Sequence, residues 1–309
     1  MRFVGYEREV STGEAGTPMK HLPLRAFAVW VLLPASMGSA LDALLDGWSR
    51  PPATVAVVFA FAGWFAGLLA LSIPRPRAFT ALRIVAPTAT AIGIAGLVRA
   101  DPVNALHVVA AAHGLLAVWV TLSADVAVRS TDGASYGNEQ RVPLQLPPQF
   151  AFVLVPGAVA FTSAGLVAGP TLLADRRWVV GAVVTVVGFV AAAVALRSLV
   201  GLERRFVVLV PAGLVISDSL VLVDPILFTR EHVRSIHPDD TTPPGVPRHQ
   251  PGALDLRLGA RRALALVADE PALIPCRNGR EGIDAVSAAR VLFAPLRREE
   301  LLAVWNSRA

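Results

Sequence analysis

Two histidines, His107 and His113, lie in one apolar stretch of the chain. A titratable ring in such a stretch would suit proton transfer, haem ligation or metal binding. Because a helical turn holds about 3.6 residues, their spacing separates the two rings by about 120° around a helix, and they cannot readily share one ligand. The apolar stretches contain no further histidine, and Cys276 is the one cysteine of the chain. We therefore expect no metal or other cofactor, and we expect both rings to form hydrogen bonds inside a helix bundle.

A mixed set of charged side chains falls at the ends of the apolar stretches. Its members are Asp42, Asp46, Arg99, Asp101 and His107. If the connections between helices alternate between two sides, all of these residues approach one face. Two interpretations stay open, because the set either binds a polar ligand or closes the loop ends with salt bridges.

The longest connection between apolar stretches is the segment 125–149, which contains "DGASYGNEQR". Its glycines and its asparagine permit turns, while Tyr136, Glu139 and Arg141 offer an exposed polar set. The segment either docks on the C-terminal region or serves as an ordinary connecting loop.

Basic side chains give the C-terminal region a character that suits phosphate headgroups or a protein partner. They are Arg230, His232, Arg234, Arg261 and Arg262. The chain contains no Walker loop, no Gly-X-Gly-X-X-Gly, no Gly-X-Ser-X-Gly and no zinc-spaced cysteine pattern. The sequence therefore identifies no catalytic residue and leans against an enzyme.

The composition indicates a membrane protein. Of 309 residues, 54% are hydrophobic and 17% are charged, whereas about a quarter are charged in an ordinary soluble domain. The formal net charge of +5 comes almost wholly from arginine, with Lys20 the one lysine. Because these arginines stand mainly beside apolar runs, membrane topology explains them better than nucleic acid does. A single cysteine also excludes a disulfide within the chain.

Six stretches are apolar over the roughly 20 residues that a helix needs to cross a bilayer. They are 26–45, 53–73, 78–98, 103–124, 150–173 and 178–196. The first has a rival interpretation as a secretory signal, but the preceding residues contain Glu7, Glu9 and Glu14 instead of a short basic region. We expect a bundle of three helical hairpins over 26–197, preceded by a cytoplasmic segment 1–25.

Lysine and arginine are unequal on the two sides of this arrangement. One side has Arg2, Arg8, Lys20, Arg25, Arg75, Arg77, Arg83, Arg129, Arg141, Arg197, Arg204 and Arg205, and the other has Arg50, Arg99, Arg176 and Arg177. Positively charged segments stay in the cytoplasm, so we expect both termini to be cytoplasmic.

Prolines and paired glycines suggest how the helices meet. Pro34, Pro87 and Pro156 fall in the first half of the odd-numbered spans, where each removes a backbone donor. Broken helices form substrate sites in transporters, although proline is also simply common in membrane helices. The pairs in "GWFAG" (63–67) and "GLVAG" (165–169) have the spacing that permits close helix approach, or match it by chance.

The stretch 205–228 is apolar but is not expected to cross a membrane. Two prolines and two aspartates divide it, which would leave backbone groups unsatisfied in lipid. We expect strands, with a hairpin turn at Ser217 to Ser219, and a mobile loop at 239–252. Further strands are predicted at 226–236, 254–258, 263–267, 272–276 and 290–294, and a last helix over 296–309 has Leu301, Leu302 and Trp305 on one face.

This order of short strands and one amphipathic helix over 203–309 resembles the bacterial pleckstrin-homology-like (PH-like) domain appended to membrane helices. The whole chain, through "SYGNEQRVPL" (135–144) and "VLVPAGLVISD" (208–218), also resembles six-span membrane proteins of high-GC bacteria that end in such a domain. The resemblance implies a membrane all-α bundle followed by a β-rich domain. It carries no activity.

Two functions from different classes follow from these features. The preferred one is an interaction or scaffold protein of the bacterial inner membrane, which presents the C-terminal domain to a protein or lipid partner or assembles as a homo-oligomer. The alternative is a small-solute or ion transporter or channel, based on the prolines, His113 and Asp42. In either case we expect the partners to be the lipid bilayer and a membrane or cytoplasmic protein, and we expect no nucleic acid.

Overall fold

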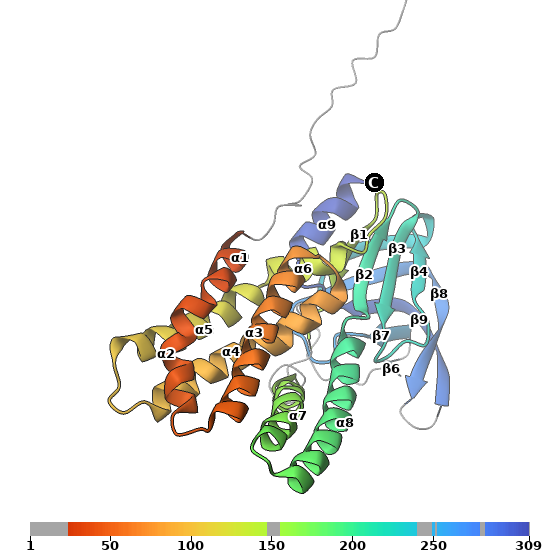
Figure 1. Ribbon diagram of the computed structural model, residues 1–309. Helices are drawn as coiled ribbons and strands as arrows, with labels where there is room; N and C mark the ends of the chain where they lie inside the picture. The colour runs from red at the N-terminus through yellow and green to blue at the C-terminus, as the bar shows by residue number, and fades with distance from the viewer. Residues whose placement is uncertain (1–23, 147–154, 240–248, 251, 279–281, 309) are drawn as a thin grey trace, which may run out of the picture.

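A helical region leads into a β-rich region in the computed structural model, which describes residues 24–146, 155–239, 249–250, 252–278 and 282–308 (Figure 1). Most of the segment 1–25 therefore lies outside the described residues. The helices before the β-rich region are α1 (Leu24–Val31), α2 (Leu33–Leu45), α3 (Arg50–Ser72), α4 (Pro76–Arg99), α5 (Ala105–Thr121), α6 (Ala124–Asp132), α7 (Val155–Ala174) and α8 (Trp178–Leu202).

Five helices among the described residues are long and apolar enough to cross a membrane: Leu24–Leu45, Arg50–Ser72, Pro76–Arg99, Val155–Ala174 and Trp178–Leu202. The sixth expected span, 103–124, is the exception. Here α5 and α6 pass the same criteria only as a pair bent by 46°. The two helices are separated at Leu122 and Ser123, and the more polar α6, "ADVAVRSTD", follows the apolar α5.

A break between α1 and α2 is bridged by two tryptophans. Pro34 has no N–H to donate to the carbonyl of Trp30 one turn earlier. That carbonyl accepts instead from the Trp64 indole nitrogen at 3.0 Å, and the Trp30 indole donates to the Trp64 carbonyl at 2.8 Å. Gly67 makes room for this pair, because a Cβ there would overlap the Trp30 ring. The "GWFAG" motif thus forms a real contact within the chain.

The second glycine pair holds α7 against α8. A Cβ on Gly165 would overlap the carbonyl of Gly188, and one on Gly169 would overlap Thr185. Close backbone approach of this kind maximises dispersion contact between helices. Of the other two expected prolines, Pro87 lies inside α4 and Pro156 is the second residue of α7.

The β-rich region has two sheets. The four-stranded sheet has the order β1-β2-β3-β4, from β1 (Gln140–Pro143), β2 (Arg205–Val210), β3 (Gly213–Asp218) and β4 (Ile226–Thr229). The five-stranded sheet has the order β5-β8-β9-β7-β6, from β5 (Val233–Asp239), β6 (His249–Gln250), β7 (Gly252–Asp255), β8 (Ala263–Asn278) and β9 (Gly282–Phe293). Pairs are antiparallel except β7 with β9.

The hairpin predicted within 213–225, with its turn at Ser217 to Ser219, is wrong, because β3 pairs instead with the strand before it, β2. Val210 pairs with Gly213, so the turn is Pro211–Ala212, whereas Ser217 belongs to β3 and pairs with Phe206. After β3 the backbone carbonyl of Asp218 accepts from Leu222 at 2.8 Å, which forms a separate turn at the end of the strand. The segment "SDS" is therefore a strand end and not a hairpin loop.

The other strand predictions hold with changed boundaries. A 3₁₀ turn at Arg230–His232 divides 226–236 into β4 and β5, while 263–267 and 272–276 join in the single strand β8, which has an irregularity between Val267 and Ala272. The region 254–258 is covered only in part by β7, and β9 includes most of 290–294. Most of the predicted loop 239–252 lies outside the described residues.

One core fills the β-rich region and includes residues from outside 203–309. The last helix, α9 (Arg298–Ser307), buries Leu301 and Trp305 in that core, as expected. Val142 and Leu144, from the segment before α7, are buried in it too. The sheet therefore takes its edge strand β1 from a part of the chain that the sequence assigned to the helical bundle.

Candidate functional site

An open pocket of about 420 Å³ lies where α2 and α4 end and α5 begins. Five of the residues that line it are the charged set predicted from sequence: Asp42, Asp46, Arg99, Asp101 and His107. The alternation of helix ends therefore brings these residues together as expected. Ser39 and Asn104, which the sequence analysis did not single out, also line the pocket.

The pocket wall at α5 is built by a capping box. The Asn104 side chain accepts from the backbone N–H groups of Leu106 at 2.9 Å and His107 at 3.2 Å. In return, Nδ1 of His107 accepts from the backbone N–H of Asn104 at 3.2 Å. Caps of this type satisfy donors that have no partner within the helix. His107 is therefore a buried structural residue at the edge of the pocket.

The polar groups of the pocket favour a small ligand that has a positive charge. Asp42, Asp46 and Asp101 are exposed carboxylates beside the single guanidinium of Arg99. The Ser39 hydroxyl is buried and has no hydrogen-bond partner among the described residues. No group of three or more His, Cys, Asp or Glu in the described part of the chain could hold a metal ion.

His113 lies away from this pocket, at the break between α1 and α2. Its Nε2 is 3.0 Å from the carbonyl oxygen of Val29, which can only accept, so Nε2 carries a hydrogen. Its Nδ1 is 2.6 Å from the Ser36 hydroxyl. The two histidines do not share a site, as the helical spacing predicted, and His113 braces the break.

The polar set in the segment 125–149 faces the β-rich region. Arg141 lies over the Phe206 ring at 5.6 Å and forms an ion pair with Glu139 at 3.4 Å. Arg308 donates to the carbonyl of Asn138 at 2.8 Å. Tyr136 alone of the three predicted residues points outward, with 80% of its surface exposed. The structure thus confirms docking on the C-terminal region.

Three of the five basic residues proposed for partner binding already have partners within the chain. His232 Nδ1 is 2.6 Å from the Thr229 hydroxyl. Arg230 lies 4.1 Å from the centre of the Trp305 ring and donates to its carbonyl at 3.1 Å. Arg234 pairs with Asp269 at 2.9 Å on the surface. Arg230 therefore anchors α9, and Arg234 contributes an exposed ion pair.

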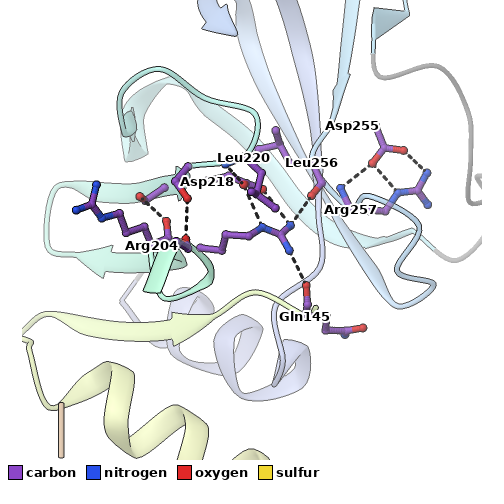
Figure 2. Close-up of polar contacts among 11 residues, drawn as sticks. Gln145, Arg204, Asp218, Leu220, Asp255, Leu256 and Arg257 are labelled. Carbon is purple, nitrogen blue, oxygen red and sulfur yellow. Dashed lines mark hydrogen bonds and ion pairs between the residues drawn. The ribbon is translucent and has the colours of Figure 1, made fainter. Parts of the chain in front are cut away.

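A buried polar network of the β-rich region was not anticipated (Figure 2). The guanidinium of Arg205 donates to both carboxylate oxygens of Asp218 at 3.0 Å. It also donates to the carbonyls of Gln145 at 3.0 Å and Leu256 at 3.2 Å. The Arg205 and Asp218 side chains are 2% and 0% exposed. The correct hairpin register would have identified the pair, because Arg205 stands directly opposite Asp218.

A second unanticipated group joins α4 to the end of α8. The Thr80 hydroxyl donates to the carboxylate of Glu203, the residue that follows α8. Burial raises the pKa of Glu203, although the Thr80 hydrogen bond and the charges of Arg83, Arg77 and Arg204 oppose the rise. Arg83 stacks on the Phe79 ring at 4.6 Å, and its Nη1 is buried with no hydrogen-bond partner among the described residues.

The chain matches no family model, no curated protein and no solved structure in the comparisons made with known proteins.

Replacing Arg205 by Met should strongly destabilise the β-rich region. Removing one partner of a buried ion pair costs about 3–5 kcal/mol, because the remaining charge is left unpaired. The matched control is Arg234→Met, which removes an exposed pair worth about 0–1 kcal/mol. Denaturant unfolding of the purified full chain measures both changes. Equal losses of unfolding free energy in the two variants would show that Arg205 has no special structural role.

The raised pKa of Glu203 predicts a pH-dependent effect. A carboxyl group with a higher pKa in the folded chain stabilises the fold below its unfolded pKa, and this contribution is lost as the pH rises through the folded pKa. Glu203→Gln keeps an acceptor for Thr80 but cannot ionise. Its thermal midpoint should therefore exceed that of the wild type at about pH 8 and match it at about pH 4, near the ordinary pKa of Glu.

The control for this experiment is Glu299→Gln. The hydrogen bond with Arg298 lowers the pKa of Glu299. Loss of this charge should therefore lower the thermal midpoint at about pH 8, whereas Glu203→Gln raises it. A lower midpoint for Glu203→Gln than for the wild type at about pH 8 would contradict the assignment.

Proposed function

We propose that the chain is a multi-pass protein of the bacterial inner membrane that holds a PH-like β-domain against the cytoplasmic face of the bilayer, where this domain recruits a protein or lipid partner. Both termini are cytoplasmic in this proposal. The partner is a membrane or cytoplasmic protein, anionic lipid, or a second copy of the chain.

The surface of α8 supports insertion in lipid. This helix packs mainly on α7, yet large apolar side chains are exposed along its length, which a helix in water would not tolerate. The exposed residues include Val179, Val180, Val183, Val186, Val187, Phe189, Val190 and Val194.

The arginine distribution supports the orientation. The ends of the helices near the β-rich region have Arg75, Arg77, Arg83, Arg129, Arg197 and Arg204. The opposite ends have Arg50, Arg99, Arg176 and Arg177. Since the richer side is retained in the cytoplasm, the β-rich region is cytoplasmic.

The single observation that carries the proposal is the firm attachment of the β-rich region to the helices. The segment after α6 supplies strand β1 to the sheet. Arg297, just before α9, forms an ion pair with Asp125 in α6. The Ser219 hydroxyl donates to the carbonyl of Gly201 in α8 at 2.8 Å. These contacts fix the position of the β-rich region relative to the helices. A scaffold that presents one surface to a partner benefits from such a fixed position more than from a flexible linker.

The PH-like assignment rests on two sheets closed by a C-terminal helix whose Leu301 and Trp305 enter their shared core. One feature departs from the simple appended domain that the resemblance implied. Strand β1 precedes α7 and α8 in the chain, so the domain is interrupted by a helical hairpin.

Cysteine labelling tests the arrangement. In a Cys276→Ser background, a membrane-impermeant maleimide should label Ser49→Cys in intact spheroplasts, because Ser49 lies at the start of α3, away from the β-rich region. It should label Arg261→Cys, an exposed residue before β8, only after lysis. Labelling of Arg261→Cys from outside the cell would overturn the proposed topology.

A transporter or channel is the second candidate, favoured by the pocket that contains Asp42 and Arg99. Crosslinking in native membranes and solute flux in proteoliposomes separate the two functions. A scaffold gives reproducible crosslinks from the β-rich region to one partner, and Asp42→Asn leaves them unchanged. Solute flux that Asp42→Asn abolishes, without such crosslinks, would favour transport instead.

A further inference from the structure

The outer part of the β8–β9 hairpin is a two-stranded extension with one buried face. Beyond the irregularity after Val267, the two strands pair from Ala272 opposite Ala288 to Asn278 opposite Gly282. Ile274 and Cys276 lie on the buried face, where Cys276 pairs with Leu222 across an isolated bridge. The hairpin is thus supported from one side only.

The opposite face is largely apolar, and the described residues do not cover it. Residues paired across antiparallel strands point to the same side, and alternate residues share a side. By this register the face contains Leu273, Pro275, Arg277, Ile283, Ala285 and Ser287. Leu273 is 73% exposed and Ile283 is 66% exposed. Among the described residues from Arg205 onward, Leu227 is the one other strongly exposed large aliphatic side chain, at 50%.

Hydrogen bonds fix this extension close to the end of α8. Ser219 donates to the Gly201 carbonyl in the last turn of α8 at 2.8 Å. Two residues further along, Val221 accepts from the backbone N–H of Arg277 at 2.7 Å, and Val223 donates to the carbonyl of Pro275 at 3.1 Å. The segment 219–223 therefore contacts both the last turn of α8 and strand β8 of the hairpin.

The direction of the hairpin adds to this proximity. In Figure 1 its outer end points away from the sheets the same way as the α7 and α8 pair does. If α8 spans a bilayer, the outer part of the hairpin therefore lies near the bilayer surface at the end of α8. Bilayer lipid surrounds a membrane helix at this depth.

We infer that this face of the β8–β9 hairpin binds the bilayer surface, with Leu273 and Ile283 entering the boundary between headgroups and acyl chains, while Arg277, whose Nε donates to the Leu222 carbonyl at 3.1 Å, lies at the edge of this face. The inference rests on the proposed membrane insertion. Amphipathic side chains at this depth combine apolar burial with attraction to anionic headgroups. A protein partner is less suited to the face, because two large apolar side chains fall far short of the about 800 Å² that each partner buries in a stable interface.

Depth-dependent fluorescence quenching of the full chain in liposomes tests this inference. A fluorophore is attached at Leu273→Cys or Ile283→Cys in the Cys276→Ser background, and the quencher is a phospholipid with a nitroxide near the top of its acyl chain. Val186→Cys in the middle of α8 is the lipid control, and Arg261→Cys is the aqueous control. Quenching at Leu273→Cys and Ile283→Cys should exceed that at Arg261→Cys several-fold.

The outcomes separate the inference from the proposed function. Quenching at Val186→Cys alone would overturn the hairpin contact and leave membrane insertion intact. Quenching at none of the four positions would overturn both. Protection of Leu273→Cys from aqueous iodide without lipid quenching would mean that protein covers the face, which also overturns the inference.

Discussion

The buried guanidinium of Arg205 is the constraint on which the β-rich region depends. A guanidinium has five N–H donors and cannot lose its charge, so burial is tolerated only if carboxylate and carbonyl oxygens surround it. Here these acceptors come from Asp218 in β3, from Gln145 after β1, and from Leu256 after β7. One side chain thus requires both sheets and the segment before α7 to be in place together. Folding of the two sheets should be cooperative for this reason.

The position of Arg205 in the chain extends this constraint to the helices. It begins β2 only three residues after α8 ends at Leu202. Between them, Glu203 accepts from Thr80 of α4. The last turn of α8, the neighbouring helix α4 and the first strand of the sheet are therefore joined within a few residues. An orientation fixed at this point is transmitted to the four-stranded sheet, because β1 and β3 both pair in register with β2.

The features that could be predicted from the sequence depend on the apolar content of a short stretch, on its periodicity, or on the alternation of helix ends between two sides. Apolar runs of about 20 residues revealed the long helices. The meeting of Asp42, Arg99 and His107 followed from placing successive helix ends on opposite sides. The hydrophobic face of α9 followed from helical periodicity. Each of these needs no knowledge of which distant segments pair.

What could not be predicted depends on pairing between distant segments. Strand β1 is four residues long and binds β2 more than sixty positions later, so no local pattern marks it. The turn Pro211–Ala212 lacks the glycine and asparagine that usually identify a tight hairpin, whereas "SDS" contains typical turn residues. That error displaced the register and concealed the pair of Arg205 with Asp218. The partners of His113 escaped prediction because they lie at a helix break about eighty residues earlier, at Val29 and Ser36.

Several polar groups within the helical region pair with one another. His113 is held by Val29 and Ser36, and the indoles of Trp30 and Trp64 bind each other's backbone carbonyls. Thr90 likewise donates to the carbonyl of Gly114 in α5 at 2.7 Å. Each of these buried groups would cost about 1–3 kcal/mol if it were left unpaired. These bonds stabilise one packing of the helices, and a fixed packing is what a firmly mounted β-domain requires beneath it.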